Sequence, residues 1–294
     1  MKPKVLFTAN EVNSSSALFN ILDHIRAKST KLDGVIIHRS QIPSVDNISQ
    51  YSAVVFDSPY ASALWTSKTP PHIKRVTLFH LIGYTDRERA WQTSWLREGR
   101  SSLVICTEKS REEYVRSKGF DNIIYIPFSF DISRFYHLPY PSEFTVGFLG
   151  VNSENKRIGI LEKIANKLNI PCVISTRNDH SGGVYSGKEL EFYKQISCYV
   201  CTAWDESGPL PPIEALLCGR PVITTPVGMM PSLVTNNGIL IPNSWDHEEV
   251  GKDLEKALLE MKAKFDSYKA NALNFTLPET AHLYEQALLE VINA

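Results

Sequence analysis

The 294-residue sequence contains no hydrophobic run that approaches the roughly 20 residues needed to cross a bilayer. Its first residues, MKPKVLFTANEV, predict a short β-strand and lack the pattern of a secretory signal peptide. These two absences predict a cytoplasmic protein. The sequence also lacks a marked charge excess, with a formal net charge of −1 beside 43% hydrophobic residues. This composition excludes an intrinsically disordered chain.

Cysteine is scarce and odd in number, and its five residues lie inside hydrophobic stretches (Cys106, Cys172, Cys198, Cys201 and Cys218). An odd set of thiols in such stretches indicates reduced core residues rather than disulfides. Cys198 and Cys201 form a Cys-x-x-Cys pair, but no second pair or neighbouring histidine accompanies it. We therefore expect these residues to pack in the core, without zinc or redox chemistry.

Short hydrophobic runs alternate with helical patterns along almost the whole chain. Strands are predicted at residues 4–8, 34–38, 53–57, 75–80, 102–107 and 123–128, and again at 144–150, 171–176, 198–204, 221–225 and 238–242. The runs are continuous rather than alternating, which is typical of parallel strands covered by helices on both faces. Residues 131–143, which contain two prolines and no periodicity, predict a linker between the two series.

Two consecutive β-α series predict an α/β chain with two Rossmann-like, doubly wound parallel-sheet domains facing a central cleft. We assign residues 1–136 to an N-terminal domain and residues 143–277 to a C-terminal domain. The last helix, within residues 278–294, is predicted to pack back toward the N-terminal domain. Ligands of such folds bind at the carboxyl ends of the strands, so substrates are expected between the domains.

Residues 205–226, DESGPLPPIEALLCGRPVITTP, hold Glu206 and Glu214 on either side of a stiff turn. Glu206 follows a predicted strand directly, and Glu214 falls in the first turns of a helix that ends at Gly219. The prolines between them fix the path of the chain, and the start of the helix favours an anion. A phosphate flanked by a hydroxyl-rich sugar suits this arrangement. A capping carboxylate and a solvated loop residue would explain the spacing equally well.

The segment ESGPLPPIEALLCGRPVITTPVG resembles the donor-binding signature of a known enzyme family. This family is the retaining, metal-independent glycosyltransferases with a GT-B fold, of the family-4 type (glycosyl transferases group 1). Its signature has two glutamates, a helix of small residues, a Cys-Gly pair and a proline, matched here by Cys218, Gly219 and Pro221. The resemblance implies a GT-B fold and sugar transfer from a nucleotide-diphosphate donor. It also implies that residues 1–136 form the acceptor-side domain and residues 143–277 the nucleotide-sugar-binding domain.

Two further segments resemble the same family. In FLGVNSENKR, Gly150 and Lys156 stand in the positions of the family's glycine and diphosphate-binding lysine. RVTLFH ends in His80, where the family has a histidine that points into the cleft and contacts substrate.

The resemblance implies a role for each of these side chains. Glu214 would accept hydrogen bonds from the donor ribose hydroxyls, and Glu206 would bind the transferred sugar near the reacting carbon. Lys156 would neutralise the diphosphate as the charge of the leaving group grows. The co-substrate would be a nucleotide sugar, with a UDP-sugar favoured, and no cofactor or metal is implied. The Asp-x-Asp pair of the other large, metal-dependent glycosyltransferase fold is absent from the sequence.

The sequence departs from the family pattern at the diphosphate site. Val151 stands where the family has an arginine, so Arg157 or Arg177 is expected to supply that cation. The loop between the glutamates also differs, and Gly208 and Leu210 are its predicted donor contacts.

The acceptor side is predicted from weaker signals. Ser15 and Trp65 are candidate contacts, and Trp91 and Trp95 lie in a second segment that mixes aromatic and basic residues. Residues 1–140 carry 18 Lys and Arg against 13 Asp and Glu. Such a pattern is typical of binding to nucleic acid or lipid headgroups. Core tryptophans with solvated surface charges are the simpler explanation.

Three functions therefore remain open. The first is sugar transfer to a hydroxyl of a glycan, a lipid-linked carrier or a small molecule, and a lipid carrier would bring the protein to a membrane surface. The second is transfer to a modified base of the hydroxymethylpyrimidine type in phage DNA, in the host cytoplasm, which the basic N-terminal half motivates. The third is non-catalytic nucleotide-sugar binding, motivated by Val151 and by Pro209, which has no N–H to donate.

Overall fold

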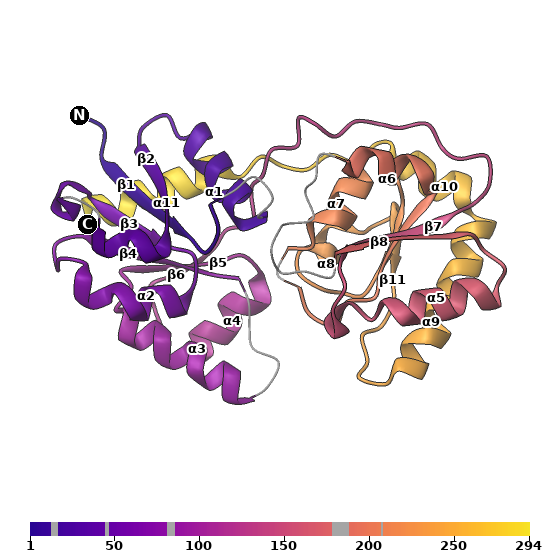
Figure 1. Ribbon diagram of the computed structural model, residues 1–294, viewed down its shortest axis with the longest axis horizontal. Helices are drawn as coiled ribbons and strands as arrows, with labels where there is room; N and C mark the ends of the chain where they lie inside the picture. The colour runs from indigo at the N-terminus through magenta and orange to yellow at the C-terminus, as the bar shows by residue number, and fades with distance from the viewer. Residues whose placement is uncertain (13–16, 45–46, 81–85, 178–187, 207) are drawn as a thin grey trace. The chain divides into compact units, whose positions relative to one another are not determined.

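The chain folds into two compact units (Figure 1). Unit 1 comprises residues 1–131 and 279–294, and unit 2 comprises residues 132–278. The computed structural model describes residues 1–12, 17–44, 47–80, 86–177, 188–206 and 208–294. Each unit is built on its own parallel β-sheet.

Unit 1 has a sheet whose described strands follow the order β2-β1-β3-β4-β5-β6, all in parallel pairs. The strands are β1 (Lys4–Ala9), β2 (Asp33–His38), β3 (Ala53–Phe56), β4 (Lys74–Phe79), β5 (Leu103–Cys106) and β6 (Ile123–Tyr125). The helices are α1 (Ala17–Lys28), α2 (Pro59–Trp65), α3 (Asp86–Gly99), α4 (Lys109–Ser117) and α11 (Ala281–Asn293), with short 3₁₀ helices η1 (Arg39–Ser44), η2 (Ile48–Gln50) and η3 (Thr66–Lys68).

Helices cover both faces of the unit-1 sheet. The connection from β1 to β2 and the connection from β3 to β4 run in opposite directions across the sheet, so right-handed crossovers put α1 and α2 on opposite faces. Helix α11 packs beside α1, and α3 packs beside α2 (Figure 1). Because both faces are covered, the strands are hydrophobic throughout rather than alternating.

Local sequence explains how the carboxyl end of β3 leads into α2. The Ser58 side chain caps the helix by accepting a hydrogen bond from the Ala61 N–H at 3.3 Å. Pro59 takes the first helical position, where no N–H is needed. Behind this turn, Val54 and Phe56 are buried in a hydrophobic cluster. The packing and the cap together fix where the helix begins.

The C-terminal helix α11 belongs to unit 1 and is anchored by Glu279. The Glu279 carboxylate accepts hydrogen bonds from the Ser129 hydroxyl at 2.6 Å and the Ala281 N–H at 2.8 Å, and lies 2.9 Å from His24 Nε2. Burial alone would raise the pKa of Glu279, but these hydrogen bonds outweigh it and lower the pKa to about 2. The helix also brings acidic residues to unit 1, which thus holds 17 Lys and Arg against 16 Asp and Glu.

Unit 2 has a sheet whose described strands follow the order β11-β10-β9-β7-β8, again in parallel pairs. The strands are β7 (Val146–Val151), β8 (Cys172–Arg177), β9 (Cys198–Cys201), β10 (Val222–Thr224) and β11 (Gly238–Leu240). The helices are α5 (Ile158–Lys167), α6 (Glu189–Gln195), α7 (Leu210–Leu217), α8 (Met230–Leu233), α9 (His247–Ala263) and α10 (Phe265–Ala272), with the 3₁₀ helix η4 (Glu154–Lys156).

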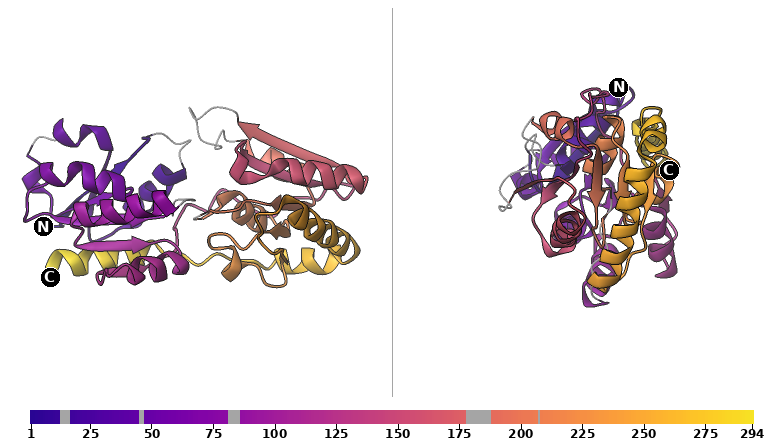
Figure 2. Two further views of the ribbon diagram at one scale, coloured as in Figure 1. Left: turned by 90° about the horizontal axis from the view of Figure 1, so that it is seen from below. Right: turned by 90° about the vertical axis from the view of Figure 1, so that its right-hand side faces the viewer.

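The unit-2 sheet is doubly wound like that of unit 1. Helices α5 and α9 pack against each other, while α7 packs on β9 and β10 (Figure 2). The step from β7 to β8 runs opposite to the steps from β9 to β11, so α5 and α7 lie on opposite faces. Two doubly wound parallel sheets confirm the predicted α/β architecture.

Residues that begin and end helices flank α7 in the sequence, with prolines at its start and Gly219 just past its end. Its hydrophobic side chains at Leu210, Ile213 and Leu216 are buried at helical spacing. Gly219, just past the helix, has a φ of 78°, the left-handed conformation that ends many helices and that favours glycine. The predicted end of the helix at Gly219 is confirmed.

The cysteines and the hydrophobic helices agree with the sequence-based expectation of a packed core. All five cysteines are free, and four of them are buried (Cys106, Cys198, Cys201 and Cys218). Burial raises the pKa of the Cys106 thiol to about 12, so it stays protonated at neutral pH. Among the described residues, no helix combines the length and hydrophobicity that a membrane span requires.

Candidate functional site

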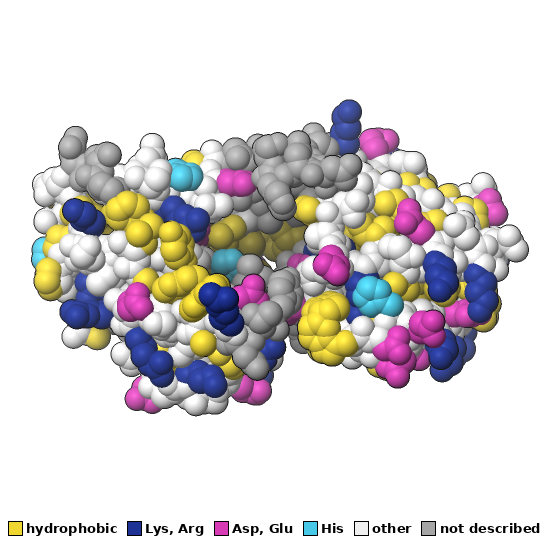
Figure 3. Space-filling model, turned by 60° about the horizontal axis from the view of Figure 1, so that its bottom comes forward, with side chains coloured by type: hydrophobic (Ala, Val, Ile, Leu, Met, Phe, Trp, Pro, Cys, Tyr) yellow, Lys and Arg dark blue, Asp and Glu magenta, His cyan; other side chains and the backbone are white. Residues whose placement is uncertain are grey.

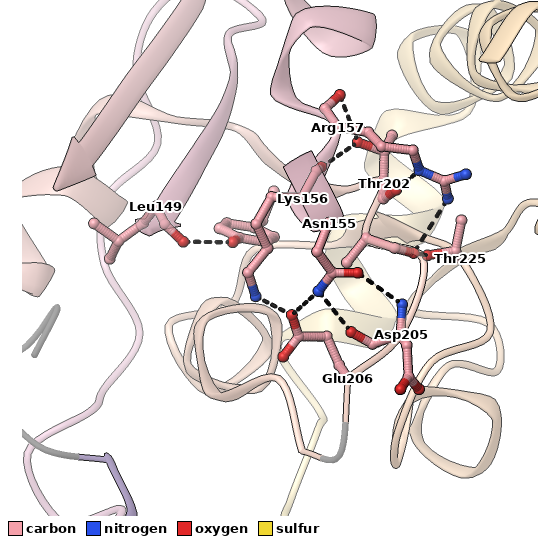
Figure 4. Close-up of polar contacts among 10 residues, drawn as sticks. Leu149, Asn155, Lys156, Arg157, Thr202, Asp205, Glu206 and Thr225 are labelled. Carbon is pink, nitrogen blue, oxygen red and sulfur yellow. Dashed lines mark hydrogen bonds and ion pairs between the residues drawn. The ribbon is translucent and has the colours of Figure 1, made fainter. Parts of the chain in front are cut away.

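Lys156 and Glu206 meet at the carboxyl edge of the unit-2 sheet. Strands β7 and β9 are neighbours, so the loops that follow them start side by side. Lys156 ends η4, after β7, and Glu206 lies five residues beyond the end of β9. The Lys156 Nζ forms an ion pair with Glu206 Oε1 (Figure 4). Their side chains are 19% and 18% exposed, so the charges are largely shielded from water yet open to a ligand.

Asn155 holds the loop that carries Glu206. Its side-chain Nδ2 donates to the Asp205 carbonyl at 2.9 Å and to Glu206 Oε1 at 3.4 Å, and its Oδ1 accepts from the Asp205 N–H at 3.2 Å (Figure 4). The Trp204 N–H donates to the Asn155 carbonyl at 3.1 Å. The Asn155 side chain therefore orients Glu206 and the backbone that precedes it.

Glu214 lies in α7 and is 1% exposed. Its Oε2 accepts a hydrogen bond from the Tyr193 hydroxyl at 2.7 Å, and its Oε1 lies 3.8 Å from Arg134 Nη2. The Tyr193 hydroxyl also lies 3.0 Å from the Pro211 carbonyl. The carboxylate is thus anchored on one side by a buried tyrosine and faced on the other by an arginine that is 43% exposed.

The start of α7 offers fewer donors than a helix start usually does. Pro209 precedes the helix, and Pro211 and Pro212 occupy its second and third positions. Proline has no N–H, so among the first three helical residues only Leu210 has an N–H to donate. The few backbone N–H groups available here give little support to the predicted preference of this helix start for an anion.

Arg157 does not point its charge outward. Its side chain is buried, and the guanidinium donates to the Thr202 carbonyl at 2.5 Å (Figure 4). It also donates to the Ser244 carbonyl and to Asn243 Oδ1, both at 2.7 Å. A guanidinium bonded in this way has little capacity left for a diphosphate. The structure argues against the predicted contact between Arg157 and the donor.

The remaining predicted donor residues lie around the same edge. Gly150 is buried in β7, where the Phe148 ring lies 2.7 Å from the place a Cβ would take. Arg177 ends β8 with its backbone paired to Val151, and its side chain is outside the described part. Gly208 lies in the loop before α7, and Leu210 is the buried first residue of that helix. Gly150 and Leu210 therefore have packing roles that require no ligand.

A cavity of about 760 Å³ lies in unit 2 along α5 and α9. Its lining reaches Ser153, Glu154 and Arg157, but it includes none of the three predicted ligand-binding charges, Lys156, Glu206 and Glu214. Hydrocarbon side chains such as Ile160 and Ile164 form part of its wall. This cavity lies beside the ion pair but is separate from it.

His80 follows β4 directly, at the carboxyl edge of the unit-1 sheet. Its Nδ1 is buried and has no hydrogen-bond partner within the described residues, and its ring centroid lies 6.3 Å from that of Phe128. Burial, and then the positive charge of Arg111, lower the pKa of His80 to about 4. The imidazole is therefore neutral at physiological pH.

We expect the neutral His80 to make unit 1 more stable as the pH rises from about 4 to about 6.5. The unfolded chain binds a proton with a histidine pKa near 6.5, whereas the folded chain binds it only near pH 4, so acid favours unfolding. Between pH 7 and pH 5 this effect should lower the free energy of unfolding by about 1 to 2 kcal/mol. Urea unfolding at both pH values should show that His80→Gln removes this decrease in the free energy of unfolding. An unchanged pH dependence in the variant would contradict a lowered pKa of His80.

The two predicted acceptor contacts find no support in unit 1. Trp65 ends α2 and packs against the cluster that contains Val54 and Phe56. Because α2 runs back from the end of β3, Trp65 lies toward the opposite edge of the sheet from His80. This position argues against an acceptor contact. Ser15 lies outside the described residues.

The tryptophans of α3 are more exposed than core residues would be. Trp91 is 45% exposed, and the guanidinium of Arg87 lies 4.6 Å from its ring centroid. Trp95 lies between Trp91 and Tyr60, at centroid distances of 6.4 Å and 5.3 Å. The expectation that these tryptophans only build the core is wrong for Trp91. On the face of unit 1 that Figure 3 shows, hydrophobic and basic side chains lie intermixed.

Sequence reasoning missed the residues that support the ion pair and Glu214. Each of them contacts a residue that is distant in the sequence. They are Asn155, which contacts Asp205; Tyr193 and Arg134, which contact Glu214; and Asn243, which contacts Arg157. Asn155 precedes the predicted lysine, and this adjacency was the one available signal. Nothing in the sequence around Tyr193 or Asn243 distinguishes them from surface residues.

Comparison with known proteins supplies the enzyme class. Residues 161–273, a range that includes Glu206 and Glu214, match the family model described as glycosyl transferases group 1. The fold is similar to that of Anabaena HepE in complex with UDP and glucose, with a TM-score of 0.70 and 15% identity over 99% of this chain and 100% of that chain. No curated protein sequence matches the chain.

Two further solved structures have a similar fold. Sucrose-phosphate synthase from Thermosynechococcus elongatus has a TM-score of 0.68 and 15% identity, covering 99% of this chain and 97% of that chain. The lipopolysaccharide outer core galactosyltransferase WaaB, in its apo form, has a TM-score of 0.65 and 12% identity, covering 98% and 99%. The structural likeness shows the GT-B fold. The family match assigns residues 161–273 to the glycosyl transferases group 1, and the protein is a glycosyltransferase.

Proposed function

We propose that the protein is a retaining glycosyltransferase that moves a sugar from a nucleotide-diphosphate donor to a hydroxyl acceptor without a metal ion. The observation that carries this proposal is the ion pair between Lys156 and Glu206 at the carboxyl edge of the unit-2 sheet. Glu214, on the helix that follows the same loop, supplies a third charged group to this donor site.

Each charged side chain has a chemical task in the proposed reaction. Lys156 exchanges Glu206 for the donor diphosphate and stabilises the negative charge that grows on the leaving group. Glu206, released from the lysine, accepts hydrogen bonds from hydroxyls of the transferred sugar. The Glu206 carboxylate lies beside Lys156, the cation that would bind the diphosphate. A group that binds the transferred sugar must lie near that cation, because the sugar is bonded to the diphosphate.

Glu214 is proposed to bind the donor ribose. A carboxylate offers two acceptor oxygens to a pair of neighbouring hydroxyls. One oxygen is held by Tyr193, and the other faces Arg134, whose side chain is partly exposed. A ribose would take the place of Arg134 at that oxygen, while Tyr193 keeps the carboxylate oriented.

A glycan or small-molecule hydroxyl is favoured over DNA as the acceptor. The near balance of charges in unit 1, 17 Lys and Arg against 16 Asp and Glu, removes the basic excess that motivated an anionic partner. DNA binding draws much of its affinity from phosphates that Lys and Arg neutralise, so a smaller basic excess favours it less. A lipid-linked acceptor stays compatible with the exposed Trp91 and its arginine.

Calorimetry with a nucleotide sugar tests the proposed donor site. UDP-glucose is the first donor to use, because the structurally similar HepE was solved in complex with UDP-glucose. We expect the wild type to bind UDP-glucose and Glu214→Gln to bind it about 10-fold more weakly, since the charged acceptor for ribose hydroxyls is lost. Glu191→Gln, which alters an exposed carboxylate of the same unit, serves as control. Equal affinity of wild type and Glu214→Gln would count against the proposed role of Glu214.

A further inference from the structure

Arg157 combines two features that a surface arginine does not need. Its backbone has a φ of 51°, in the left-handed region that side chains other than glycine rarely adopt. Its side chain is only 4% exposed, although burial of a guanidinium is unfavourable without hydrogen-bond partners. A strained backbone and a buried charge in one residue imply that the surrounding structure depends on this side chain.

The guanidinium joins the ends of separate strands. It donates to the carbonyls of Thr202 and Ala203, which follow β9, at 2.5 Å and 3.3 Å. It also donates to the Ser244 carbonyl and the Asn243 side chain, which follow β11, both at 2.7 Å. Arg157 itself follows β7 and η4, so one planar group connects three loops at the carboxyl edge of the sheet.

The loops that Arg157 joins are those that present the ion pair. Thr202 returns the contact, because its hydroxyl donates to the carbonyls of Lys156 and Arg157 at 3.0 Å and 3.3 Å (Figure 4). Asn243 extends the network by donating from Nδ2 to the Trp204 carbonyl at 2.7 Å. The backbone is therefore held immediately before Glu206 and at Lys156.

We propose that Arg157 is a positioning residue for the sugar-transfer reaction, acting through the backbone of residues 156 and 202–204 to hold Lys156 and Glu206 at the donor. The inference rests on the proposed function of that pair. Arg157 itself contacts no substrate, because its donors are directed at backbone carbonyls and at Asn243. Lysine cannot substitute, since a single ammonium lacks the planar set of donors that reaches the loops after β9 and β11 together.

Two substitutions separate the backbone of Arg157 from its guanidinium. Arg157→Gly accepts the positive φ without strain but removes the side chain. Arg157→Lys keeps a positive charge but loses the planar set of donors. Arg100→Gly is the matched control, because Arg100 also has a positive φ, 45°, but is exposed and lies in unit 1.

The experiment measures kcat and KM for UDP-glucose turnover, with and without millimolar guanidinium chloride, far below denaturing concentrations. We expect kcat to fall about 10- to 100-fold in Arg157→Gly and Arg157→Lys, because small misplacements of reacting groups cost this much. Added guanidinium should restore part of kcat in Arg157→Gly only. Arg100→Gly should behave as the wild type in both conditions.

The outcomes distinguish a positioning role from general damage and from a failure of the proposed function. Wild-type kcat in Arg157→Gly, or a loss that guanidinium does not restore in a cooperatively folded variant, overturns the proposal. If Arg157→Gly does not fold, a wild-type kcat in Arg157→Lys overturns it.

If the wild type neither binds nor turns over a nucleotide sugar, the proposed function fails. Near-ultraviolet circular dichroism still tests the inferred support of the loop in that case, because the Arg157 guanidinium lies 5.6 Å from the Trp204 ring centroid. An unchanged tryptophan signal in Arg157→Gly would then overturn that support.

Discussion

Replacement of Lys156 by alanine is expected to lower kcat for sugar transfer from UDP-glucose by on the order of 100-fold. Lys156 is the cation of the ion pair with Glu206, and both side chains are shielded from most of the solvent. A charge in such surroundings stabilises a developing negative charge more strongly than one in water.

Steady-state kinetics of UDP-glucose turnover at saturating UDP-glucose measure this effect. Lys167→Ala is the matched control, because Lys167 also pairs with a glutamate in unit 2, Glu255 at 2.7 Å, but is 61% exposed. An exposed pair contributes little, so this variant should keep the wild-type kcat. A rise in KM for UDP-glucose with unchanged kcat in Lys156→Ala would show that Lys156 binds the donor without stabilising the leaving group.

Replacement of Arg220 by methionine is expected to lower the free energy of unfolding of unit 2 by about 3 kcal/mol. Arg220 is fully buried, and its guanidinium donates to the carbonyls of Tyr193 at 2.9 Å, Leu138 at 2.8 Å and Pro139 at 2.5 Å. Methionine fills most of the volume but leaves these carbonyls without donors. Buried carbonyls that lose their partners account for the expected loss.

Urea unfolding measures the change in stability, and hydrogen exchange of peptides around residues 136–142 locates it. Arg116→Met is the control, because Arg116 also donates to a carbonyl, that of Ile123 at 2.8 Å, but from a side chain that is 48% exposed. This control should change the stability by less than about 1 kcal/mol, since water replaces its hydrogen bonds. A loss in Arg220→Met no larger than in the control would show that the buried carbonyls find other donors.

Hydrophobic periodicity, together with the residues that begin and end helices, explains which strands and helices could be predicted from the sequence. The hydrophobic runs at residues 4–8 and 53–57 became β1 and β3, because a run flanked by turn residues encodes a buried strand locally. Helix α7 likewise begins beside its prolines and ends before Gly219. Such signals operate over a few residues, and the sequence displays them in full.

The contacts of the Arg157 side chain could not be predicted from such local signals. From the sequence, an arginine beside a predicted diphosphate lysine is a second cation for the donor. Its guanidinium is instead directed at carbonyls 45 and 87 residues further along the chain. No local pattern records that those carbonyls converge on it, because their position depends on how β9 and β11 are ordered in the sheet.

The charge of unit 1 was also decided by tertiary structure. Counted along the chain, residues 1–140 have a basic excess, with 18 Lys and Arg against 13 Asp and Glu. The structure adds the acidic residues of α11 to that unit, through the contacts of Glu279 with Ser129 and His24. Charge counted by position in sequence therefore overstated the attraction for an anionic partner.

The sequence by itself determined the order of strands and helices and the presence of a lysine and two glutamates typical of glycosyl transferases group 1. Spacing and periodicity encode such features, because they involve residues close together in the chain. Only the tertiary structure decided that Lys156 meets Glu206, that Tyr193 holds Glu214 and that Arg157 supports the backbone around them. Those contacts join residues from different strands and loops, so they exist only after the sheet has brought distant segments to one edge.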